Sequence, residues 1–565
     1  MADRLVTSPS ELTAYRRSRG KRLTTPWPLG PLAPIDLTSL VGAWSSSIAT
    51  RLRYADSGGR RLLGQWQEFP ATLGVGKPEA SSDPEVVRRV LCALDEAIYH
   101  LDSVSEPCSV HLEVRLSGTV VEDRLRQAVG MALARHPRAR ARATMARLRR
   151  AGYEWEIPPA PDVDPLDVVL CSDDDALQAV RADLQSLAVP LATSPPLRIR
   201  LAHHRSGDVV MLNLHHAAGD GIAALGLLRS IARAYAGRCD PVSQTPPEEL
   251  KIPALSGRWA QLRALMGELR QAAPRSAHLI PIGGEDRPGY WLYHLVLDPA
   301  QTAALVATAE GGTTVNDLLL AGLHLALDSW NCEHGGVPGR LSVLMPVNLR
   351  PKASWHELFG NFTYMVPVVT RPEDRADPTA TVEAIRRRTR RIKAERTPAA
   401  VVKLLDVLQH LPLPAKRSIA RLAASERVMP TAILSNLGRL DEDLDFGPEL
   451  RAREVWFSPP TRMPMGLALG AVTAVGWLHL VFRYRHPLLG PVEVAGFADR
   501  YLAALGHVAA YVDQLDQALG SPTEPTTSPP QGGGLRASSL TDTRHGPQAP
   551  GGSQHGPPVT RPGPR

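Results

Sequence analysis

Residues 208–236 read DVVMLNLHHAAGDGIAALGLLRSIARAYA, and the rest of the chain is best interpreted outward from this stretch. Its first nine residues predict a short β-strand, and the apolar residues that recur over 222–236 predict a helix with one buried side. Between the two elements, HHAAGDG places His215 and His216 where the strand ends. The two glycines of this segment allow the backbone to turn tightly into the helix. The sequence therefore predicts a strand–turn–helix unit that projects an imidazole at the turn.

The HHAAGDG segment is the strongest chemical signal in the chain. A match to H-H-x-x-x-D-G is expected by chance on the order of 0.002 times in a chain of this composition. An imidazole with a pKa near 6.5 suits abstraction of a proton from a hydroxyl or an amine, and the N-terminus of the following helix offers N–H donors to a developing negative charge. Two other interpretations stay open: a metal site formed by the histidines with Asp220, and a purely structural histidine pair. The metal site lacks a third ligand in a supporting motif, and adjacent side chains at a strand end diverge.

Strands and helices alternate on both sides of this unit. In the first half, residues 110–116 predict a half-buried strand and residues 121–133 predict a helix. A second set begins near Tyr290. Its predicted strands are 291–297, 341–350 and 362–370, and its predicted helices are 315–330 and 382–395. Two α/β lobes of similar size imply a cleft between them.

The predicted domain order follows from these patterns and from composition. The expected parts are a partly disordered N-terminal extension (1–85), a first lobe (86–240), a crossover linker (241–289), a second lobe (290–518) and a disordered tail (519–565). The tail is assigned as disordered because Pro, Gly, Ser and Thr dominate it, and such a segment cannot bury enough apolar surface to offset its loss of entropy.

Composition excludes several classes of protein. Hydrophobic residues make up 43% and charged residues 21%, which is ordinary for a globular chain, and a net charge of +7 over 565 residues does not indicate nucleic-acid binding. The five cysteines lie far apart and form no C-x-x-C pair, so a cytoplasmic location is expected. Residues 465–482 carry no formal charge and just reach the length of a membrane span. The alternation in their second half instead predicts a buried β-hairpin that turns near Gly476.

Two clusters of basic residues need an interpretation. Seven arginines lie between Arg135 and Arg150, and alternation with alanine predicts a solvated strand face. The second cluster, in the predicted helix 382–395, consists of Arg386, Arg387, Arg388, Arg390, Arg391 and Lys393. This helix is interpreted as a solvated face, with attraction of the phosphates of coenzyme A or of an acidic carrier protein as the alternative.

Residues 215–221 resemble the H-H-x-x-x-D-G signature of the condensation-domain and acyl-CoA-dependent acyltransferase superfamily. That superfamily includes condensation domains of nonribosomal peptide synthesis, polyketide-associated acyltransferases and wax ester synthase/diacylglycerol acyltransferases. Further matches occur in the expected order: LDEAIYHLD (94–102), TTVNDLLLAGL (313–323), MPVNLRP (345–351), GNFTYMVPV (360–368) and SNLG (435–438). The resemblance covers about residues 90–515.

The resemblance implies an α/β fold of two chloramphenicol-acetyltransferase-like lobes around a central tunnel. It implies that His216 is the general base, with His215, Asp220 and Gly221 beside it, and that the backbone near Gly221 stabilises the oxyanion. Asp220 is expected to be structural and to pair with a buried Arg350. The residues expected to line or brace the tunnel, with ordinary turn and strand-end roles as the alternative, are Asn316, Asn361, Ser435 and Asn436.

The resemblance also implies the reactants. The expected donor is an acyl-CoA or an acyl-carrier protein supplied in trans, because no carrier-protein motif is visible in the chain. The expected acceptor is an alcohol, which gives an ester, with an amine acceptor or a catalytically silent binding protein of the same fold as alternatives. SNLG departs from the SNVPGP of the wax ester branch, which weakens that assignment within lipid or secondary metabolism. No bound cofactor, metal, nucleic acid or transmembrane segment is expected, and peripheral membrane contact is left open.

Overall fold

The structure is a computed structural model. It describes residues 78–79, 86–145, 152–240, 274–309, 312–350, 358–395, 410–440 and 444–520. Most of the expected N-terminal extension, residues 241–273 of the expected linker and residues 521–565 of the expected tail lie outside this part of the chain.

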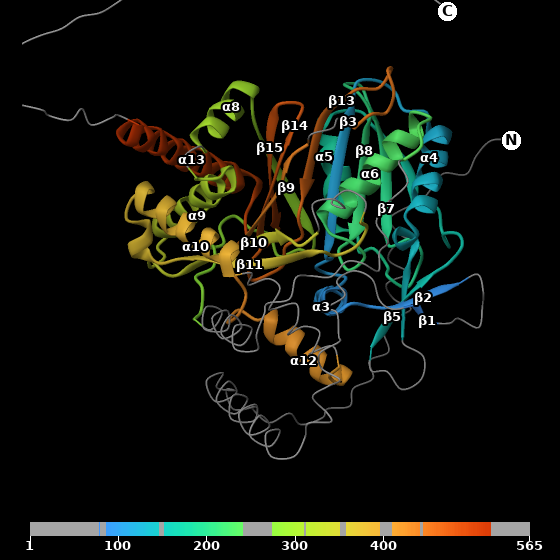
Figure 1. Cartoon of the computed structure of the whole chain (residues 1–565), viewed down its shortest axis with the longest axis horizontal. Helices are drawn as coiled ribbons and strands as arrows, with labels where there is room; N and C mark the ends of the chain where they lie inside the picture. Colours follow the sequence, from blue (N-terminus) through green and yellow to red (C-terminus); the bar gives the residue numbers. More distant parts are fainter. Residues whose placement is uncertain are drawn as a thin grey trace, which may run out of the picture. The chain divides into compact units, whose positions relative to one another are not determined.

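A five-stranded sheet forms the core of the first lobe (Figure 1). Its order is β13–β3–β8–β7–β6, with β3 at Ser109–Leu116, β6 at Leu166–Cys171, β7 at Leu197–His204, β8 at Val209–His215 and β13 at Ala452–Ser458. Helices α4 (Glu122–Arg135) and α6 (Gly221–Tyr235) pack on one face of this sheet, and α5 (Asp174–Ser186) packs on the other. The predicted strand–turn–helix unit is confirmed, because β8 ends at His215 and α6 begins at Gly221.

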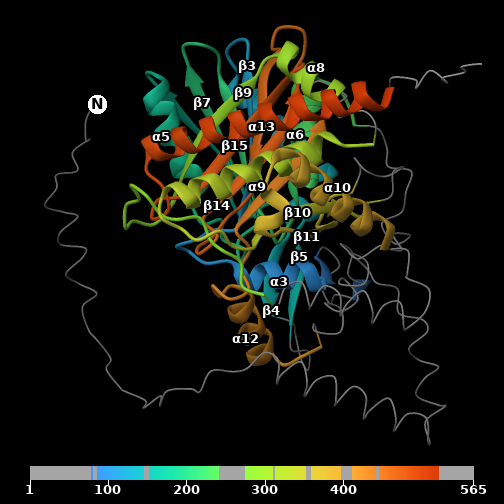
Figure 2. The same cartoon turned by 90° about the vertical axis from the view of Figure 1, so that its left-hand side faces the viewer.

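A six-stranded sheet forms the core of the second lobe. Its order is β11–β10–β12–β14–β15–β9, with β9 at Tyr290–Leu297, β10 at Leu341–Asn348, β11 at Thr363–Thr370, β12 at Ala432–Arg439, β14 at Leu467–Ala474 and β15 at Trp477–Arg485. The helices of this lobe are α8 (Pro299–Thr308), α9 (Val315–Glu333), α10 (Pro378–Glu395) and α13 (Pro491–Gly520). Figure 2 shows α9 and α13 lying across this sheet, and their apolar residues share one core with its strands.

A small third sheet and two further helices lie beside the lobes. The sheet has the order β1–β2–β5–β4, with β1 at Pro78–Glu79, β2 at Val87–Val90, β5 at Tyr153–Ile157 and β4 at Arg142–Met145. The helices are α3 (Ala93–Leu101) and α12 (Leu413–Ala423), and short 3₁₀ turns occur at Pro137–Arg140 and Pro372–Arg375. Helices α3 and α12 are tied together by Lys416, whose Nζ donates to both carboxylate oxygens of the buried Glu96 at 2.8 Å.

The two lobes are joined by a strand that changes sheets. β13 comes from the second half of the chain but pairs antiparallel with β3 of the first lobe. It also packs against β14 so closely that a Cβ on Gly470 would lie 2.4 Å from the Phe457 carbonyl oxygen. Arg483 of β15 is fully buried at the same junction and donates to the carbonyl oxygens of Ser109 and Gln185 at 2.8 and 3.0 Å.

The hairpin interpretation of the uncharged stretch 465–482 is confirmed. β14 and β15 pair antiparallel over their whole length, and Val475 and Gly476 between them have φ values of 52° and 82°. Two consecutive residues with positive φ are typical of a type I′ hairpin turn. None of the described helices has the length and apolar character needed to cross a bilayer.

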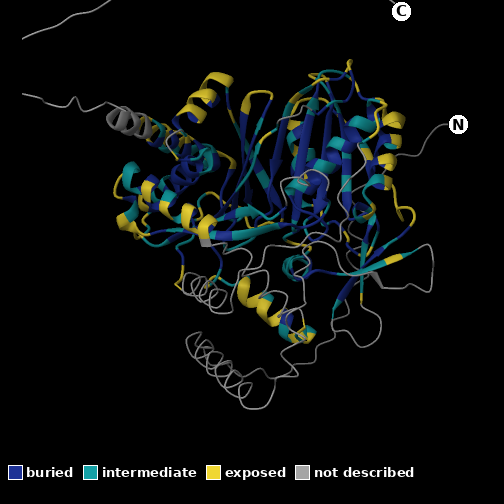
Figure 3. Cartoon of the chain, viewed as in Figure 1, coloured by how far each residue is buried: buried dark blue, intermediate teal, exposed yellow. Residues whose placement is uncertain are grey.

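The half-buried assignment of residues 110–116 is wrong, because both faces of β3 are covered. Figure 3 shows the central strands of the sheet as buried. His111 and Glu113 point away from the α4/α6 core and are fully buried. Arg181 of α5 pairs with the Glu113 carboxylate, and Trp456 of β13 lies against the His111 ring. Burial raises the pKa of Glu113, but Arg181 and His111 outweigh this effect and bring the pKa to about 2.

The described part of the arginine-rich segment, up to Met145, is also not a solvated strand face, whereas Arg147, Arg149 and Arg150 lie outside the described residues. Ala139 and Ala141 are fully buried, and Arg140 between them donates to the carbonyl oxygens of Leu133 and Pro158 at 2.7 and 2.8 Å. Arg138 pairs with Asp95, and Arg142 pairs with Glu156 and with Asp162. The alternation of arginine with alanine could not distinguish these paired arginines from solvent-exposed ones, because their carboxylate partners are distant in the sequence.

The close approach of β13 and β14 gives a stability test. Gly470→Ala places a methyl group against the backbone of β13, and we expect it to lower the free energy of unfolding by about 1–3 kcal/mol. Gly130→Ala, in helix α4, is the matched control, because no atom lies within 4 Å of its added Cβ. Alanine is more stable than glycine inside a helix by up to about 1 kcal/mol, so this variant should not lose stability. Urea denaturation measures both. Equal midpoints for Gly470→Ala and the wild type would contradict the close packing.

Candidate functional site

His215 is the last residue of β8 and is almost completely buried. Its Nδ1 accepts a hydrogen bond from the backbone N–H of Ala217 at 3.1 Å, and its carbonyl oxygen accepts from Ala218 at 2.9 Å. Because Nδ1 is an acceptor, the neutral ring carries its proton on Nε2. His215 therefore closes the turn that presents the next residue.

His216 is the first residue of that turn and is only partly buried. Its backbone N–H donates to the Cys108 carbonyl oxygen at 2.8 Å. Burial lowers the pKa of the ring, as does His215, while the residue's own carbonyl, Asp220 and Asn361 act in the opposite direction. The net lowering keeps the His216 imidazole unprotonated at neutral pH.

Asn361 holds the turn from the second lobe. Its side chain is buried, and Nδ2 lies 2.8 Å from the His216 carbonyl oxygen and 3.0 Å from that of Ala217. The same nitrogen lies 3.0 Å from Oδ1 of Asp95, which is also buried. Asn361 thus braces the backbone of His216, and its assignment to a tunnel stays a prediction.

Asp220 caps α6 and is tied to the second lobe by three residues. Its Oδ1 accepts from the Ala223 N–H at 3.0 Å, and Arg350 donates to Oδ1 and Oδ2 at 2.8 Å each. Oδ2 also accepts from the Phe362 N–H at 3.0 Å and from the Thr363 hydroxyl at 2.9 Å. The expected pair with Arg350 is present, and both side chains are buried.

The charge state of Asp220 follows from these partners. Burial raises the pKa of the carboxyl, but the Arg350 charge, its hydrogen bonds and the N–H groups of Phe362 and Ala223 outweigh this effect. The pKa of Asp220 therefore lies below its ordinary value. A carboxylate whose lone pairs are filled in this way orders the turn and is not available to take up a proton.

Gly221 begins α6 at a point where side chains leave little room. A Cβ at Gly221 would lie 3.1 Å from Leu437, which belongs to the SNLG segment of the second lobe. The N-terminal backbone of α6 therefore lies near the end of β12, although the two are far apart in sequence.

Among the described residues, no hydrogen bond joins the other predicted site residues to the histidine turn. Asn316 lies at the start of α9, and its Nδ2 is 3.0 Å from the Met345 sulfur. Ser435 and Asn436 lie on β12, and the Asn436 side chain accepts from the Gly438 N–H at 2.8 Å. Their assignment to a tunnel stays a prediction.

Three residues that hold the turn were not identified from the sequence: Asp95, Asp102 and Cys108. Asp95 and Asp102 lie within LDEAIYHLD, seven positions apart, which is two turns of a helix. Asp95 lies in the first turn of α3 and Asp102 is its C-cap, and the motif that contains both residues was the available signal.

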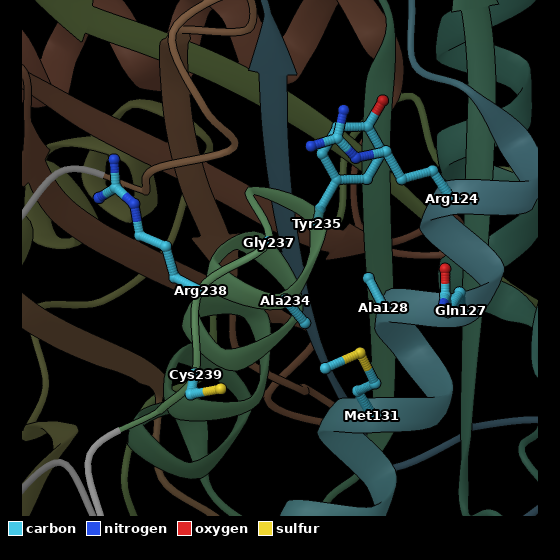
Figure 4. A pocket seen from close by; sticks show the side chains of 9 residues that line it. All are labelled: Arg124, Gln127, Ala128, Met131, Ala234, Tyr235, Gly237, Arg238 and Cys239. Atoms are coloured by element: carbon cyan, nitrogen blue, oxygen red, sulfur yellow. The ribbon is translucent and has the colours of Figure 1, made fainter.

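The structure also has a hollow between α4 and the end of α6, with a volume of about 210 Å³ (Figure 4). Its wall includes Arg124, Met131, Tyr235, Arg238 and Cys239, and the Arg124 guanidinium lies 4.6 Å from the centre of the Tyr235 ring. None of the predicted site residues lines it. Among the described residues, no group of three His, Cys, Asp or Glu side chains is arranged to hold a metal ion.

Comparison of the sequence with known proteins identifies relatives of this chain. An uncharacterised protein of Mycobacterium tuberculosis is 34% identical over 423 residues, which is 73% of this chain and 97% of the relative. Tyrocidine synthase 1 of Brevibacillus parabrevis is 25% identical over 296 residues, which is 49% of this chain and 26% of that much longer protein. No family model matches the chain.

Solved structures show the same fold. The first condensation domain of the CDA synthetase matches with a TM-score of 0.58 at 16% identity, over 75% of this chain and 96% of that one. The trichothecene 15-O-acetyltransferase TRI3 of Fusarium sporotrichioides matches with a TM-score of 0.56 at 12% identity, over 78% and 98%. The starter condensation domain of rhizomide synthetase, solved with C8-CoA, matches with a TM-score of 0.56 at 15% identity, over 75% and 95%.

The chain belongs to the same family as the Mycobacterium tuberculosis protein, and it shares its fold with these condensation domains and with TRI3. The two-lobed α/β fold expected from the sequence is confirmed.

The ion pair that ties the two lobes gives the second prediction. Asp220→Asn or Arg350→Gln leaves one buried charge without its partner, and we expect either change to lower stability by about 3–5 kcal/mol. Because the folded pKa of Asp220 is lowered, the pair stabilises the protein fully above about pH 4 and less as the pH falls below that value. The difference in melting temperature between the wild type and Asp220→Asn should therefore narrow toward about pH 3.

Arg371→Gln is the control for this measurement. It removes an ion pair whose two side chains are about 70% exposed, and we expect a change below about 1 kcal/mol. Calorimetry at several pH values measures all three variants. If Asp220→Asn and Arg371→Gln melt alike, the buried pair does not stabilise the fold.

Proposed function

We propose that this protein is an acyltransferase that moves an acyl group from a thioester to a hydroxyl acceptor, with His216 as the general base. The observation that carries the proposal is the arrangement of the turn. A partly exposed imidazole with a lowered pKa is held between two lobes by hydrogen bonds at its own N–H and carbonyl group.

The proposed reaction is a direct transfer. The His216 imidazole removes the acceptor's proton as its oxygen attacks the thioester carbon, and the thiolate leaves after the tetrahedral intermediate collapses. The proton returns from His216 to the departing sulfur. The N-terminus of α6, which begins at Gly221, is the proposed source of N–H donors to the oxyanion. No covalent acyl-enzyme forms in this scheme.

The neighbours support this choice of reactants. TRI3 is named as an O-acetyltransferase, and the rhizomide starter domain was solved with an acyl-CoA. For this chain, the proposed donor is an acyl-CoA or an acyl-carrier protein, and the proposed acceptor is an alcohol. An amine acceptor gives the corresponding amide through the same base.

The direct test of the proposed function is the release of free thiol from a panel of acyl-CoAs in the presence of alcohol or amine acceptors. Turnover with alcohols supports ester formation, and turnover with amines alone supports the amide-forming alternative. If no acceptor increases thiol release above hydrolysis, the protein is a non-catalytic member of the family and the proposal fails.

The role of His216 gives the third prediction. His216→Ala should reduce turnover by about 10²–10⁴-fold, the range for loss of a general base, without a change in folding. His203→Ala is the control, because His203 begins a second His-His pair at the end of β7, where its Nδ1 lies 2.7 Å from Asp208. Equal activity of His216→Ala and the wild type would remove His216 from the mechanism.

The pKa of His216 predicts the pH dependence of the same reaction. Because burial lowers the pKa, the base stays unprotonated as the pH falls through about 6.5, and the acid limb of kcat/KM should have its midpoint below that value. A midpoint above about 6.5 would show that a different group, or a different environment, controls the step.

The basic face of α10 gives the fourth prediction. We favour a solvated face, on which the exposed Arg387, Arg391 and Lys393 have no part in catalysis. Their reversal to glutamate should then leave the donor KM and its salt dependence unchanged. If the helix instead attracts an anionic donor, the donor KM should rise and its salt dependence should flatten, while kcat stays constant. Reversal of Arg417, Arg421 and Arg427, on and after α12, is the control for net charge.

A further inference from the structure

Helix α3 approaches the histidine turn with a carboxylate at its C-terminal end. Asp102 is the C-cap of α3, and its backbone N–H donates to the Ile98 carbonyl oxygen at 3.1 Å. Its side chain turns away from the helix toward the segment that precedes β3. This carboxylate has two oxygens, and each is directed to a different part of the turn.

The first oxygen acts through the backbone. Oδ1 of Asp102 accepts a hydrogen bond from the Cys108 N–H at 2.8 Å. The carbonyl oxygen of Cys108 in turn accepts from the His216 N–H at 2.8 Å. The position of the His216 backbone is therefore fixed through one intervening residue.

The second oxygen acts through the neighbouring imidazole. Oδ2 of Asp102 lies 3.4 Å from Nε2 of His215, an electrostatic contact longer than an ordinary hydrogen bond. Nε2 carries the proton in this ring, because Nδ1 accepts from the Ala217 N–H. The carboxylate thus favours the neutral tautomer of His215 that carries its proton on Nε2. In that tautomer Nδ1 can accept from the Ala217 N–H, the hydrogen bond that closes the turn.

We propose that Asp102 is a positioning residue for the general base: it sets the backbone of His216 through Cys108 and the ring of His215 through Nε2. This inference rests on the proposed function, in which His216 is the base. Asn361, which is itself held by Asp95, donates to the His216 carbonyl oxygen, so the backbone of His216 is fixed at both its N–H and its carbonyl group. A displacement of about 1 Å in such a group lowers a rate by about 10²-fold.

A carboxylate is required at position 102 because both of its neighbours are donors. Asn has the same shape but offers one oxygen and one NH₂ group. If the Asn oxygen accepts from the Cys108 N–H, the Asn NH₂ group faces the His215 Nε2–H, which is also a donor. If the side chain is turned the other way, the NH₂ group faces the Cys108 N–H instead, so one pair of donors always meets. Asn is nevertheless well tolerated at the end of a helix, so Asp102→Asn tests the site and spares the helix.

The chain supplies a matched control. His204 ends β7 as the second residue of the pair His203-His204, is buried, and has Nε2 3.5 Å from Oδ1 of Asp174. Asp174→Asn therefore removes the same charge from the same kind of contact, away from the histidine turn of β8.

The experiment combines kinetics with amide hydrogen exchange on the full-length chain. For Asp102→Asn we expect kcat to fall by about 10–100-fold, with both KM values within about twofold of the wild type. We expect the amides of residues 216 and 217 to exchange about tenfold faster, while β3 and α6 keep their protection. Asp174→Asn should change neither quantity.

Three outcomes would overturn the inference. An unchanged kcat in Asp102→Asn shows that the base does not depend on Asp102. Faster exchange throughout the first lobe, with a matching fall in melting temperature, shows that Asp102 is only a structural residue. If the wild type shows no turnover, the proposed function fails separately, and amide exchange alone tests Asp102. Faster exchange confined to residues 216 and 217 then supports Asp102 as the anchor of the turn. Unchanged exchange overturns that role.

Discussion

The buried ion pair between Asp220 and Arg350 is the interaction on which the site depends. The two residues are 130 positions apart and lie in different lobes, yet the guanidinium meets both carboxylate oxygens at 2.8 Å. Asp220 simultaneously caps α6 and accepts from the chain that enters β11. The helix that follows the histidines and the start of β11 in the second lobe are therefore held at a single side chain. Removing either partner leaves an unpaired buried charge, which is far more costly than the loss of an exposed pair.

The junction between the lobes extends this arrangement with further polar contacts. β13 completes the first sheet, and Arg483 reaches from β15 to carbonyl oxygens of β3 and α5, with its guanidinium 4.0 Å from the centre of the Tyr290 ring. Such contacts are directional and cannot slide, unlike an interface made of apolar side chains alone. The histidine turn lies at the end of β8, next to β3, so its position follows from the same contacts.

The chain contains two His-His pairs at strand ends, and their surroundings separate their roles. His203 and His204 end β7 and face Asp208, Ser206 and Asp174 in a surface turn. His215 ends β8, and His216 begins the turn that Asn361 braces from the other lobe. Only the second pair is followed directly by a helix whose N-cap is tied to a distant arginine. The dipeptide itself carries no function without these neighbours.

Local patterns in the sequence determined a large part of this structure. The alternation near Gly476, the glycines after His216 and the apolar period of residues 222–236 depend on neighbours within a few positions, so hairpin, turn and helix could be predicted. The pairing of Asp220 with Arg350 was expected only from the family resemblance, not from a local pattern. Reasoning from local patterns failed for residues 110–116 and for the arginine-rich segment. Alternation along a strand shows which face is apolar, but it does not show whether another part of the chain covers the polar face.

Only the tertiary structure decided which polar groups hold the base. Asn361 lies 145 residues from His216 and 266 from Asp95 in the sequence, and Asp102 reaches His215 from a helix more than a hundred positions earlier. No local period encodes such contacts, since they arise when two lobes and a helix pack around one turn. The sequence by itself determined that a histidine stands at the end of a strand before a helix. The fold determined its exposure, its lowered pKa and the anchors of its backbone, because burial and hydrogen bonding are properties of the packed chain.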